Sequence, residues 1–378
     1  MKVVHVLNEI RHSGAETMLA SAATFLMGKA PAIVVSTGAE IGSYAERLKR
    51  AGYKVIHIPY ARSPLFWLRI FRMLREESAD VLHVHTERAS PYYSVVAALV
   101  GIGCVRTIHN EFQFAGILRL RRLIWRQLAR LSGTVHVAVS SRVARNEKSQ
   151  FGCDTLLAEN WYDPTRIQET TKERRLLARN CLGLDEESFV AVAIANEGPS
   201  KNLEALIKAI ELCNNDMSIR LLHCGAHGEE LKATADRVPK GAVSLMGTVD
   251  DIGLYLAACD AFVSPSFYEG GPIVLMEAAA SGAVCITTRV GCAVDFEGLK
   301  NVVFVDPSPQ SIAEALRQVA RRPRESRSAD GQQLAHAMRR RFTPEVGASR
   351  YLEIYRQAFT KSRRYKERLT DAALESVE

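Results

Sequence analysis

Short runs of β-branched residues alternate with amphipathic segments along nearly the whole chain, and this alternation constrains the fold more than any other feature. Strands and helices that alternate in this way are typical of parallel, doubly wound sheets. The runs in the first half predict strands at 3–7, 32–36, 54–58, 81–85, 105–109 and 135–139. The runs in the second half predict strands at 189–195, 219–224, 242–246, 261–264, 283–287 and 302–305.

The alternation pauses once, after Asn160, where Asp163 and Pro164 form a turn signal. A chain of 378 residues exceeds the size at which single cores usually stop growing. We therefore predict an α/β fold with one Rossmann-like domain at 1–165 and a second at 166–345, followed by a basic tail within 346–378. Sheets of this kind bind ligands at the carboxyl ends of their strands, so we expect the two domains to face a shared cleft.

Composition excludes several classes of protein. With 47% hydrophobic and 24% charged residues the chain is typical of globular proteins. Uncharged apolar stretches such as 89–105 are too short to span a bilayer, and the first eight residues predict a strand, so a cytoplasmic protein is expected. The eight cysteines are scattered, which favours buried reduced thiols over zinc ligands or disulfides, and no metal site is predicted.

The positive charge lies in the first half of the chain. Residues 1–165 carry 21 Lys and Arg against 13 Asp and Glu, whereas the remainder carries 28 against 29. Such a distribution favours a phosphate-bearing or anionic-surface partner for the first half. Nucleic acid is not expected, because no aromatic platform or known binding module accompanies the charge.

The most informative segment is SPSFYEGGPIVLMEAAASG at 264–282. A strand ends at Pro265, a glycine turn follows, and Pro272 is expected at the first position of a helix, where a missing N–H is tolerated. Amides at such a helix start can bind an anion. Glu277 lies in the helix among apolar residues, so its carboxylate requires polar partners, and sugar or ribose hydroxyls would supply them. The alternative is one exposed glutamate on a polar stripe.

Two further strand-to-helix turns could contact phosphate. In 195–210, Ser200 is expected as N-cap and Lys201 at the start of the helix, although a surface lysine fits the same pattern. In 224–230, the glycines, Gly225 among them, fit close backbone approach or simple packing. The chain has neither the GxGxxG fingerprint after a strand nor the GxxxxGK[ST] loop, which disfavours the usual NAD and ATP enzymes.

Together these residues resemble the retaining glycosyltransferases of family 4, which have the GT-B fold and transfer a sugar from a nucleotide sugar without a metal ion. The resemblance covers nearly all of the chain, and its most specific part is the pair Glu269 and Glu277. It implies that the second domain binds the nucleotide-sugar donor, with a UDP-sugar favoured and no cofactor, and that the first domain lies on the acceptor side. It also implies that 346–378 contains a terminal helix, similar to the family's at 343–359, which returns to the first domain.

The resemblance assigns roles on the donor side. Glu269 would contact the transferred sugar, the Gly270 and Gly271 amides would bind sugar and phosphate, Glu277 would hold the ribose, and Lys201 would stabilise the departing diphosphate. The remaining donor-binding residues would be Gly14, Asn196, Asn202, Gly225, Pro272 and Ile273. Asn202 replaces a common glycine of the family, and Asn196 replaces its usual arginine, so one of two expected cations is missing.

The resemblance also assigns residues in the first half. The segment Ser13-Gly14-Ala15-Glu16 is similar to the glycine loop of the family, with Ser13 in place of its first glycine. His109, in the segment 107–110, would approach the transferred sugar and act as a catalytic residue. The other acceptor-side residues would be His12, Ser13, Glu16, His85, Glu87 and Asn110.

The acceptor is less constrained. Segment 114–131 interleaves five arginines with Leu, Ile and Trp125, and 63–75 is similar. Helices of this kind can lie on an anionic membrane, which would suit a lipid-linked acceptor and a peripheral enzyme at the inner membrane face. An ordinary helix that covers the sheet and turns its arginines to solvent explains the pattern equally well.

Two other functions fit the same fold. One is a nucleotide-sugar epimerase or hydrolase. The other is a non-catalytic partner that binds a nucleotide sugar, a reading motivated by Asn196 in place of the expected arginine. The acceptor of a transferase would be a saccharide or a lipid-linked glycan, as in polysaccharide or glycoconjugate synthesis.

Overall fold

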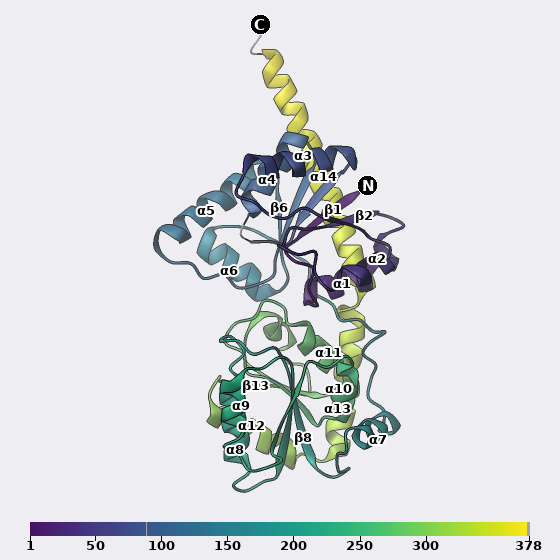
Figure 1. Ribbon diagram of the computed structural model, residues 1–378, viewed down its shortest axis with the longest axis vertical. Coiled ribbons are helices and arrows are strands. Elements are labelled where there is room, and N and C mark those ends of the chain that lie inside the picture. The colour runs from purple at the N-terminus through teal and green to yellow at the C-terminus, as the bar shows by residue number, and fades with distance from the viewer. Residues whose placement is uncertain (88, 376–378) are drawn as a thin grey trace. The chain divides into compact units, whose positions relative to one another are not determined.

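The computed structural model describes residues 1–87 and 89–375, with side chains as far as Arg363 (Figure 1). The chain divides into two compact units. The first comprises Met1–Asn160 together with Pro344–Glu378, and the second comprises Trp161–Thr343. Each unit has its own parallel sheet with helices packed against it, so each is a Rossmann-like α/β domain.

The first unit contains a sheet in the order β3-β2-β1-β4-β5-β6-β7. Its strands are β1 (Val3–Leu7), β2 (Ala32–Ser36), β3 (Lys54–His57), β4 (Val81–Val84), β5 (Gly103–Ile108), β6 (Val135–Ala138) and β7 (Leu156–Leu157). Its helices are α1 (Gly14–Leu26), α2 (Ala45–Arg50), α3 (Pro64–Glu76), α4 (Ser90–Val100), α5 (Gly116–Leu131), α6 (Ser141–Phe151) and α14 (Pro344–Glu375).

The second unit contains a sheet in the order β10-β9-β8-β11-β12-β13. Its strands are β8 (Phe189–Ile194), β9 (Ile219–Cys224), β10 (Val243–Gly247), β11 (Ala261–Ser264), β12 (Val284–Thr287) and β13 (Val302–Phe304). Its helices are α7 (Lys172–Cys181), α8 (Leu203–Cys213), α9 (Glu229–Ala235), α10 (Ile252–Ala258), α11 (Ile273–Ser281), the 3-10 helix η1 (Gly291–Phe296), α12 (Pro309–Arg321) and α13 (Arg324–Arg341).

The strands of both sheets follow the β-branched runs of the sequence closely. Four begin and end at the predicted residues, those at 3–7, 32–36, 219–224 and 261–264, and most others differ by a residue or two. The central strands are buried on both faces, as parallel strands covered by helices must be. Strand β7 was not predicted, because two leucines make too short a run to stand out.

The joint between the units lies at Asn160–Trp161, five residues before the predicted boundary of 165. Trp161 and Tyr162 are buried, and Tyr162 belongs to the core of the second unit. Its amide donates to the carbonyl of Phe342 over 3.2 Å. The turn at Asp163 and Pro164 therefore follows the joint.

Helix α14 belongs to the first unit. It begins at Pro344, packs against α1 and β5, and buries Tyr351 and Tyr355 against the sheet. The packing is close, since a Cβ on Gly103 would lie 2.8 Å from the backbone of Ala358. This helix therefore completes one face of the first sheet.

Two further observations concern the chain as a whole. Within the described residues no helix combines the length and apolarity that crossing a membrane would require. Seven of the eight cysteines are buried free thiols, whereas Cys181 at the end of α7 is exposed. The expectation that all the thiols are buried is thus wrong for Cys181.

Candidate functional site

The second unit brings together two predicted donor-side residues that lie 68 positions apart. Lys201, in the loop after β8, forms an ion pair with Glu269, in the loop after β11. The same carboxylate oxygen accepts a hydrogen bond of 3.0 Å from the hydroxyl of Ser266. Because β8 and β11 are adjacent parallel strands, their carboxyl ends place these two loops side by side. The result is an anchored carboxylate beside a half-exposed ammonium group.

The start of helix α8 differs from the prediction. The helix begins at Leu203, and its N-cap is Asn202 in the left-handed conformation (φ 56°), so the prediction of Ser200 as N-cap is wrong. The side-chain amide of Asn202 donates to the carbonyls of Pro265 and Pro307 over 3.1 and 3.0 Å. Asparagine tolerates this backbone conformation and ties the loop of Lys201 to two neighbouring loops. Asn202 is thus a structural residue of the site.

The glycine turn after Glu269 is held by a residue that the sequence did not single out. Gly291, at the start of η1, has a φ of 51°, and a Cβ at this position would lie 2.6 Å from the carbonyl oxygen of Gly270. Only glycine allows this approach without displacing the turn. Pro272 is the N-cap of α11, which begins at Ile273, so Pro272 precedes the first helical position that was predicted for it. No local signal in the sequence would have identified Gly291.

Glu277 lies in α11 and is 3% exposed, which excludes an exposed glutamate on a polar stripe. Burial raises the pKa of Glu277 to about 7, against the opposing effect of Arg166, while Asp163 raises it further. Oxygen Oε1 lies 3.6 Å from the guanidinium of Arg166, and it is buried without a hydrogen-bond partner among the described residues. A buried acceptor of this kind requires a donor, which a ligand hydroxyl would supply. Arg166 was not predicted, although it follows the turn signal directly.

Asn196 and Gly225 shape the loop beside this site. The side-chain oxygen of Asn196 accepts from the amide of Ala226 over 3.0 Å, so Asn196 bridges the loops after β8 and β9. Gly225 has a φ of 147°, and a Cβ there would lie 2.0 Å from the carbonyl oxygen of Ala195. Close backbone approach, rather than simple packing, therefore explains this glycine. Asn196 supplies no positive charge in place of the family arginine.

In the first unit, the sheet register places four histidines in one row. His5 of β1 lies opposite His83 of β4, and His85 and His109 follow at the strand ends. Hydrogen bonds of 3.0 Å join His5 Nδ1 to His85 Nε2, and His85 Nδ1 to His109 Nε2. Burial lowers the pKa of His5 to about 3 and of His109 to about 4, and it lowers the pKa values of His83 and His85 well below the usual range. The rings are therefore neutral at physiological pH.

The hydrogen bonds of the row constrain the tautomer of His109. Each neutral ring has one donor and one acceptor nitrogen, so every proton in the row must point the same way. His5 Nε2 is buried without a partner among the described atoms, and an unpaired acceptor costs less than an unpaired N–H. This favours protons on Nδ1 of all three rings. His109 then presents an Nδ1–H donor away from the row.

Helix α14 and strand β5 supply the hydrogen-bond partners of His83, the remaining ring of this group. The hydroxyl of Tyr355 lies 2.8 Å from His83 Nδ1, and the hydroxyl of Thr107 lies 2.7 Å from His83 Nε2. Within the described part of the chain, His5, His83 and His85 form one group whose nitrogens lie close enough to share a metal ion. Both nitrogens of His83 are already hydrogen-bonded, so binding an ion would require these bonds to break.

The predicted glycine loop is the first turn of a helix. Ser13 is the N-cap of α1, which begins at Gly14, and its hydroxyl donates to the carboxylate of Glu16. Glu16 is buried, and burial raises its pKa. His12 is exposed, with its ring centre 5.1 Å from that of Tyr44 in an edge-to-face arrangement, and Asn110 is exposed beyond β5. Gly14 and Ser13 thus provide a helix start near the carboxyl end of β1.

Glu87 belongs to a buried ionic cluster, which the sequence did not predict. Arg106 and Arg126 donate to its carboxylate, the latter over 3.2 Å, and Arg126 also donates to Glu147 over 2.6 and 2.9 Å. Burial alone would raise the pKa of Glu87, but Arg106 and Arg126 outweigh it and lower the pKa. We refer to Glu87, Arg106, Arg122, Arg126 and Glu147 as the ionic cluster. Both carboxylates of the ionic cluster, those of Glu87 and Glu147, are paired with arginines.

Two family models match the chain, one in each unit. Residues 12–165 match the model described as Glycosyltransferase Family 4, and residues 187–322 match the model described as Glycosyl transferases group 1. The second match includes Lys201, Glu269 and Glu277.

Curated relatives are similar at low identity. The UDP-Gal:α-D-GlcNAc-diphosphoundecaprenol α-1,3-galactosyltransferase of Escherichia coli is 26% identical over 245 residues, which are 59% of this chain and 61% of that protein. The match thus spans less than two thirds of that relative. The Bacillus subtilis protein EpsF, which is assigned to the glycosyltransferases, is 26% identical over 308 residues, 75% of this chain and 78% of that protein.

Solved structures share the fold. Anabaena HepE in complex with UDP has a TM-score of 0.79 at 18% identity, covering 94% of this chain and 99% of that protein. WaaG, a glycosyltransferase involved in lipopolysaccharide biosynthesis, has a TM-score of 0.72 at 16% identity, covering 92% and 98%.

Proposed function

This chain belongs to glycosyltransferase family 4 and has the GT-B fold, and from this membership we propose that it transfers a sugar from a nucleotide sugar to an acceptor hydroxyl. The donor is a UDP-sugar, the transfer retains the configuration of the sugar, and neither a metal ion nor a cofactor takes part. The second unit binds the donor.

The observation that carries the proposal is the pairing of a buried, unsatisfied carboxylate with an anchored lysine–glutamate pair on adjacent loops. The Oε1 atom of Glu277 lacks a hydrogen-bond donor, and ribose hydroxyls provide donors of the right kind. Lys201 and Glu269 lie at the carboxyl ends of β8 and β11, where sheets of this type bind nucleotides. The site therefore offers a ribose acceptor, a cation for diphosphate and a carboxylate for sugar hydroxyls.

The proposed reaction is a displacement on one face of the sugar. The bond between the anomeric carbon and the diphosphate oxygen breaks while the acceptor oxygen bonds to that carbon from the same side. The proton of the acceptor hydroxyl moves to the leaving diphosphate oxygen. Lys201 and the amides of Gly270 and Gly271 stabilise the charge that develops on the diphosphate, which is the role a metal ion would otherwise fill.

The ion pair in the structure must rearrange for this role. In the absence of a donor, the ammonium of Lys201 is neutralised by Glu269. A bound diphosphate would compete for Lys201 and release the carboxylate of Glu269 to sugar hydroxyls. Donor binding is thereby coupled to the release of the Glu269 carboxylate for contact with the sugar. His109, with its Nδ1–H donor, is our candidate for a further contact with the transferred sugar.

We propose that the acceptor is lipid-linked and that the protein contacts the inner face of an anionic membrane. The name of the Escherichia coli relative specifies a diphosphoundecaprenol acceptor, and WaaG is a glycosyltransferase involved in lipopolysaccharide biosynthesis. The product would then be an intermediate of polysaccharide or glycoconjugate synthesis. An acceptor saccharide without a lipid is the alternative, and an acceptor panel separates the two.

A donor screen tests the proposal. We expect a UDP-sugar, and neither GDP- nor ADP-sugars, to raise the unfolding temperature, because binding to the native state alone adds about 2.7 kcal/mol at a hundredfold excess over Kd. Lys201→Ala should lower kcat by about 100-fold or more, with a smaller effect on donor affinity. Lys208→Ala is the matched control, since Lys208 is an exposed lysine of the adjacent helix α8.

Three outcomes would contradict the proposal. Rapid isomerisation of the donor, or stoichiometric release of free sugar, would indicate an epimerase or hydrolase. Donor binding without turnover across lipid-linked and soluble acceptors would indicate a non-catalytic partner, in keeping with the missing charge at Asn196. Equal kcat values for Lys201→Ala and Lys208→Ala would contradict the placement of the diphosphate.

A further inference from the structure

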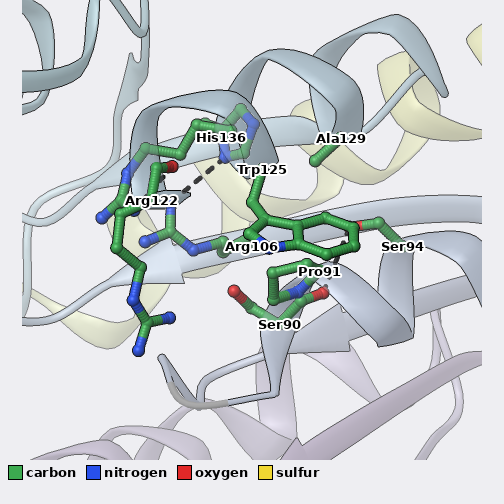
Figure 2. A pocket seen from close by; sticks show the side chains of 9 residues that line it. Ser90, Pro91, Ser94, Arg106, Arg122, Trp125, Ala129 and His136 are labelled. Carbon is green, nitrogen blue, oxygen red and sulfur yellow. Dashed lines mark hydrogen bonds between the residues drawn. The ribbon is translucent and has the colours of Figure 1, made fainter. Parts of the chain in front are cut away.

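Helix α5 turns two of its five arginines, Arg122 and Arg126, toward the protein, while Arg119, Arg121 and Arg130 are exposed. An ordinary sheet-covering helix would bury its leucines and turn its arginines to solvent. Here the arginines of the ionic cluster point into the protein: Arg126 is 4% exposed and pairs with Glu147 and Glu87. Figure 2 shows Arg122, Trp125 and Ala129 of this helix lining a small pocket with Arg106 and His136. The alternative interpretation, a solvent-facing arginine stripe, is therefore wrong for Arg122 and Arg126.

The ionic cluster explains this orientation. Glu147 in α6 is fully buried, and an unpaired buried carboxylate would be strongly destabilising. Arg126 satisfies both oxygens of Glu147, and Arg122 and Arg126 together contact Glu87. These contacts fix one face of α5 toward the sheet. The opposite face must then point outward.

That outward face of α5 is apolar. Its members recur every three or four positions, as one stripe of a helix does, and each is exposed: Ile117 (87%), Leu120 (57%), Ile124 (48%), Leu128 (48%) and Leu131 (69%). Leaving such side chains in water forgoes their burial energy, so an isolated protein in water gains nothing from the arrangement.

The apolar surface continues onto the two preceding helices. Helix α4 packs between α3 and α5 in the first unit (Figure 1). Tyr92, Val95 and Leu99 form the exposed stripe of α4, and Leu65 and Leu68 are exposed on α3. We refer to the exposed side of α3, α4 and α5 as the apolar face.

An aromatic row joins the three helices. The ring of Trp67 in α3 lies 5.4 Å from that of Tyr92 in α4, which lies 5.6 Å from that of Trp125 in α5. Tyr and Trp rings, apolar with one polar atom, are the side chains enriched where membrane meets water.

Exposed large hydrophobic side chains are concentrated on these three helices. Among the residues that the structure describes, nineteen large hydrophobic side chains are exposed, and eleven of them lie on α3, α4 and α5. Single exposed hydrophobic residues are normal, but a contiguous patch marks an interaction surface.

The charges around the apolar face select the partner. Arg69, Arg72 and Arg75 are exposed on α3, beside Leu65 and Leu68, and Arg121 is exposed on α5. Neither α4 nor α5 contains an aspartate or glutamate. A second copy of the chain would bring these arginines against one another, which is unfavourable. An anionic lipid surface offers an apolar interior and a complementary charge at once.

We propose that the apolar face of α3, α4 and α5 inserts into the headgroup region of an anionic bilayer, with the ionic cluster holding α5 in the orientation that insertion needs. The purpose of this insertion, access to a lipid-linked acceptor, rests on the proposed function. The lipid contact itself depends only on the surface just described.

Vesicle flotation tests the proposal with the full chain. Wild-type protein should bind vesicles of phosphatidylglycerol and phosphatidylethanolamine, and bind pure phosphatidylcholine vesicles far more weakly. The triple variant L120S/I124S/L128S should lower the partition coefficient by about tenfold or more, because three inserted side chains are lost. All three residues are exposed, so the variant is expected to fold. Leu176→Ser/Leu177→Ser, which removes two exposed leucines from α7 in the second unit, is the matched control.

A second variant set separates charge from apolar insertion. R69Q/R72Q/R75Q should weaken binding to the anionic vesicles and remove most of its salt dependence, while leaving the weak binding to neutral vesicles unchanged. Equal binding to anionic and neutral vesicles by the wild type would contradict the anionic specificity.

The proposal fails if L120S/I124S/L128S floats with anionic vesicles as the wild type does. It also fails if the wild type is a dimer that this variant converts to a monomer without vesicle binding in either, since the face would then join two copies. Binding and release of a UDP-sugar in detergent-free buffer, measured on the same variant, reports on the proposed function separately. Unchanged donor binding with lost flotation would support both proposals.

Discussion

At the scale of single residues, Glu277 gives a prediction in pH. Burial raises its pKa to about 7, so in the folded protein this carboxyl is protonated at pH 5 to 6 and ionises near neutrality. Because the pKa of Glu277 is higher in the folded protein than in the unfolded chain, protonated Glu277 stabilises the fold at low pH. This stabilisation is lost as the pH rises through 7. Without ligand, the free energy of unfolding of the wild type should therefore fall between pH 6 and 8. The share of this fall that comes from Glu277 should be absent in Glu277→Gln.

Donor binding should show the opposite trend, because the ionised carboxylate is the better acceptor for two ribose hydroxyls. Affinity for a UDP-sugar, measured by calorimetry, should rise between pH 6 and 8 in the wild type. In Glu277→Gln it should be weaker by about tenfold at pH 8 and independent of pH, given that hydrogen bonds to charged groups contribute about 1.5 to 3 kcal/mol. A pH-independent wild type that binds no tighter than the variant would contradict the ribose assignment.

From the sequence, the apolar neighbours of Glu277 singled out that residue, and the resemblance to family 4 assigned donor-side roles to Lys201 and Glu269 as well. The sequence could not select Gly291 or Arg166, because each acts through a tertiary approach, to the carbonyl of Gly270 and to the carboxylate of Glu277. Neither approach leaves a local pattern.

At the scale of elements, η1 supports the loop that carries Glu269. A side chain at Gly291 would strain a left-handed backbone and collide with the carbonyl of Gly270. Gly291→Ala should therefore cost more than about 1 kcal/mol of stability and also lower kcat, by displacing Glu269. Gly298→Ala is the matched control: its φ is 83°, but no atom lies within 4 Å of the added Cβ. We expect it to lose stability without losing kcat, and equal kcat losses in both variants would contradict this role for η1.

The elements also show which predictions the sequence can support. β-branched runs located every strand except β7, because the burial of central strands on two faces imposes the pattern. Helical periodicity likewise revealed two faces on α5, but it could not indicate which face is inside. That choice depends on Glu87 and Glu147, which lie 39 and 21 positions from Arg126. Ser200 was preferred as N-cap on frequency alone, whereas contacts from Pro265 and Pro307 favour Asn202.

At the scale of the whole molecule, the two units have separate cores and should respond to different changes. Arg126→Met removes both hydrogen bonds to the buried carboxylate of Glu147 and leaves it only the 3.6 Å ion pair with Arg106, so it should destabilise the first unit by about 3 to 5 kcal/mol. A UDP-sugar should protect the second unit. Hydrogen exchange followed by mass spectrometry should show faster exchange in β4, β5 and β6 of the variant than of the wild type. Addition of the donor should slow exchange around Lys201 and Glu277. Arg130→Met, an exposed change on the same helix, should leave β4 to β6 unaffected; a uniform response across both sheets would contradict this independence.

The route of the chain through its units bears on how the protein matures. Strand β1 precedes α14 along the chain by more than 300 residues, so the sheet that contains β1 lacks one covering helix until α14 has been synthesised. Tyr355 of that helix supplies the partner of His83 Nδ1, and Tyr351 a further partner of Thr107, and both contacts are missing from a nascent chain that ends at Thr343. The second unit, encoded between the two parts of the first, has all its strands before then. The amino-terminal unit is therefore the last to reach its native state, and chaperones that bind unfinished chains would find their substrate there.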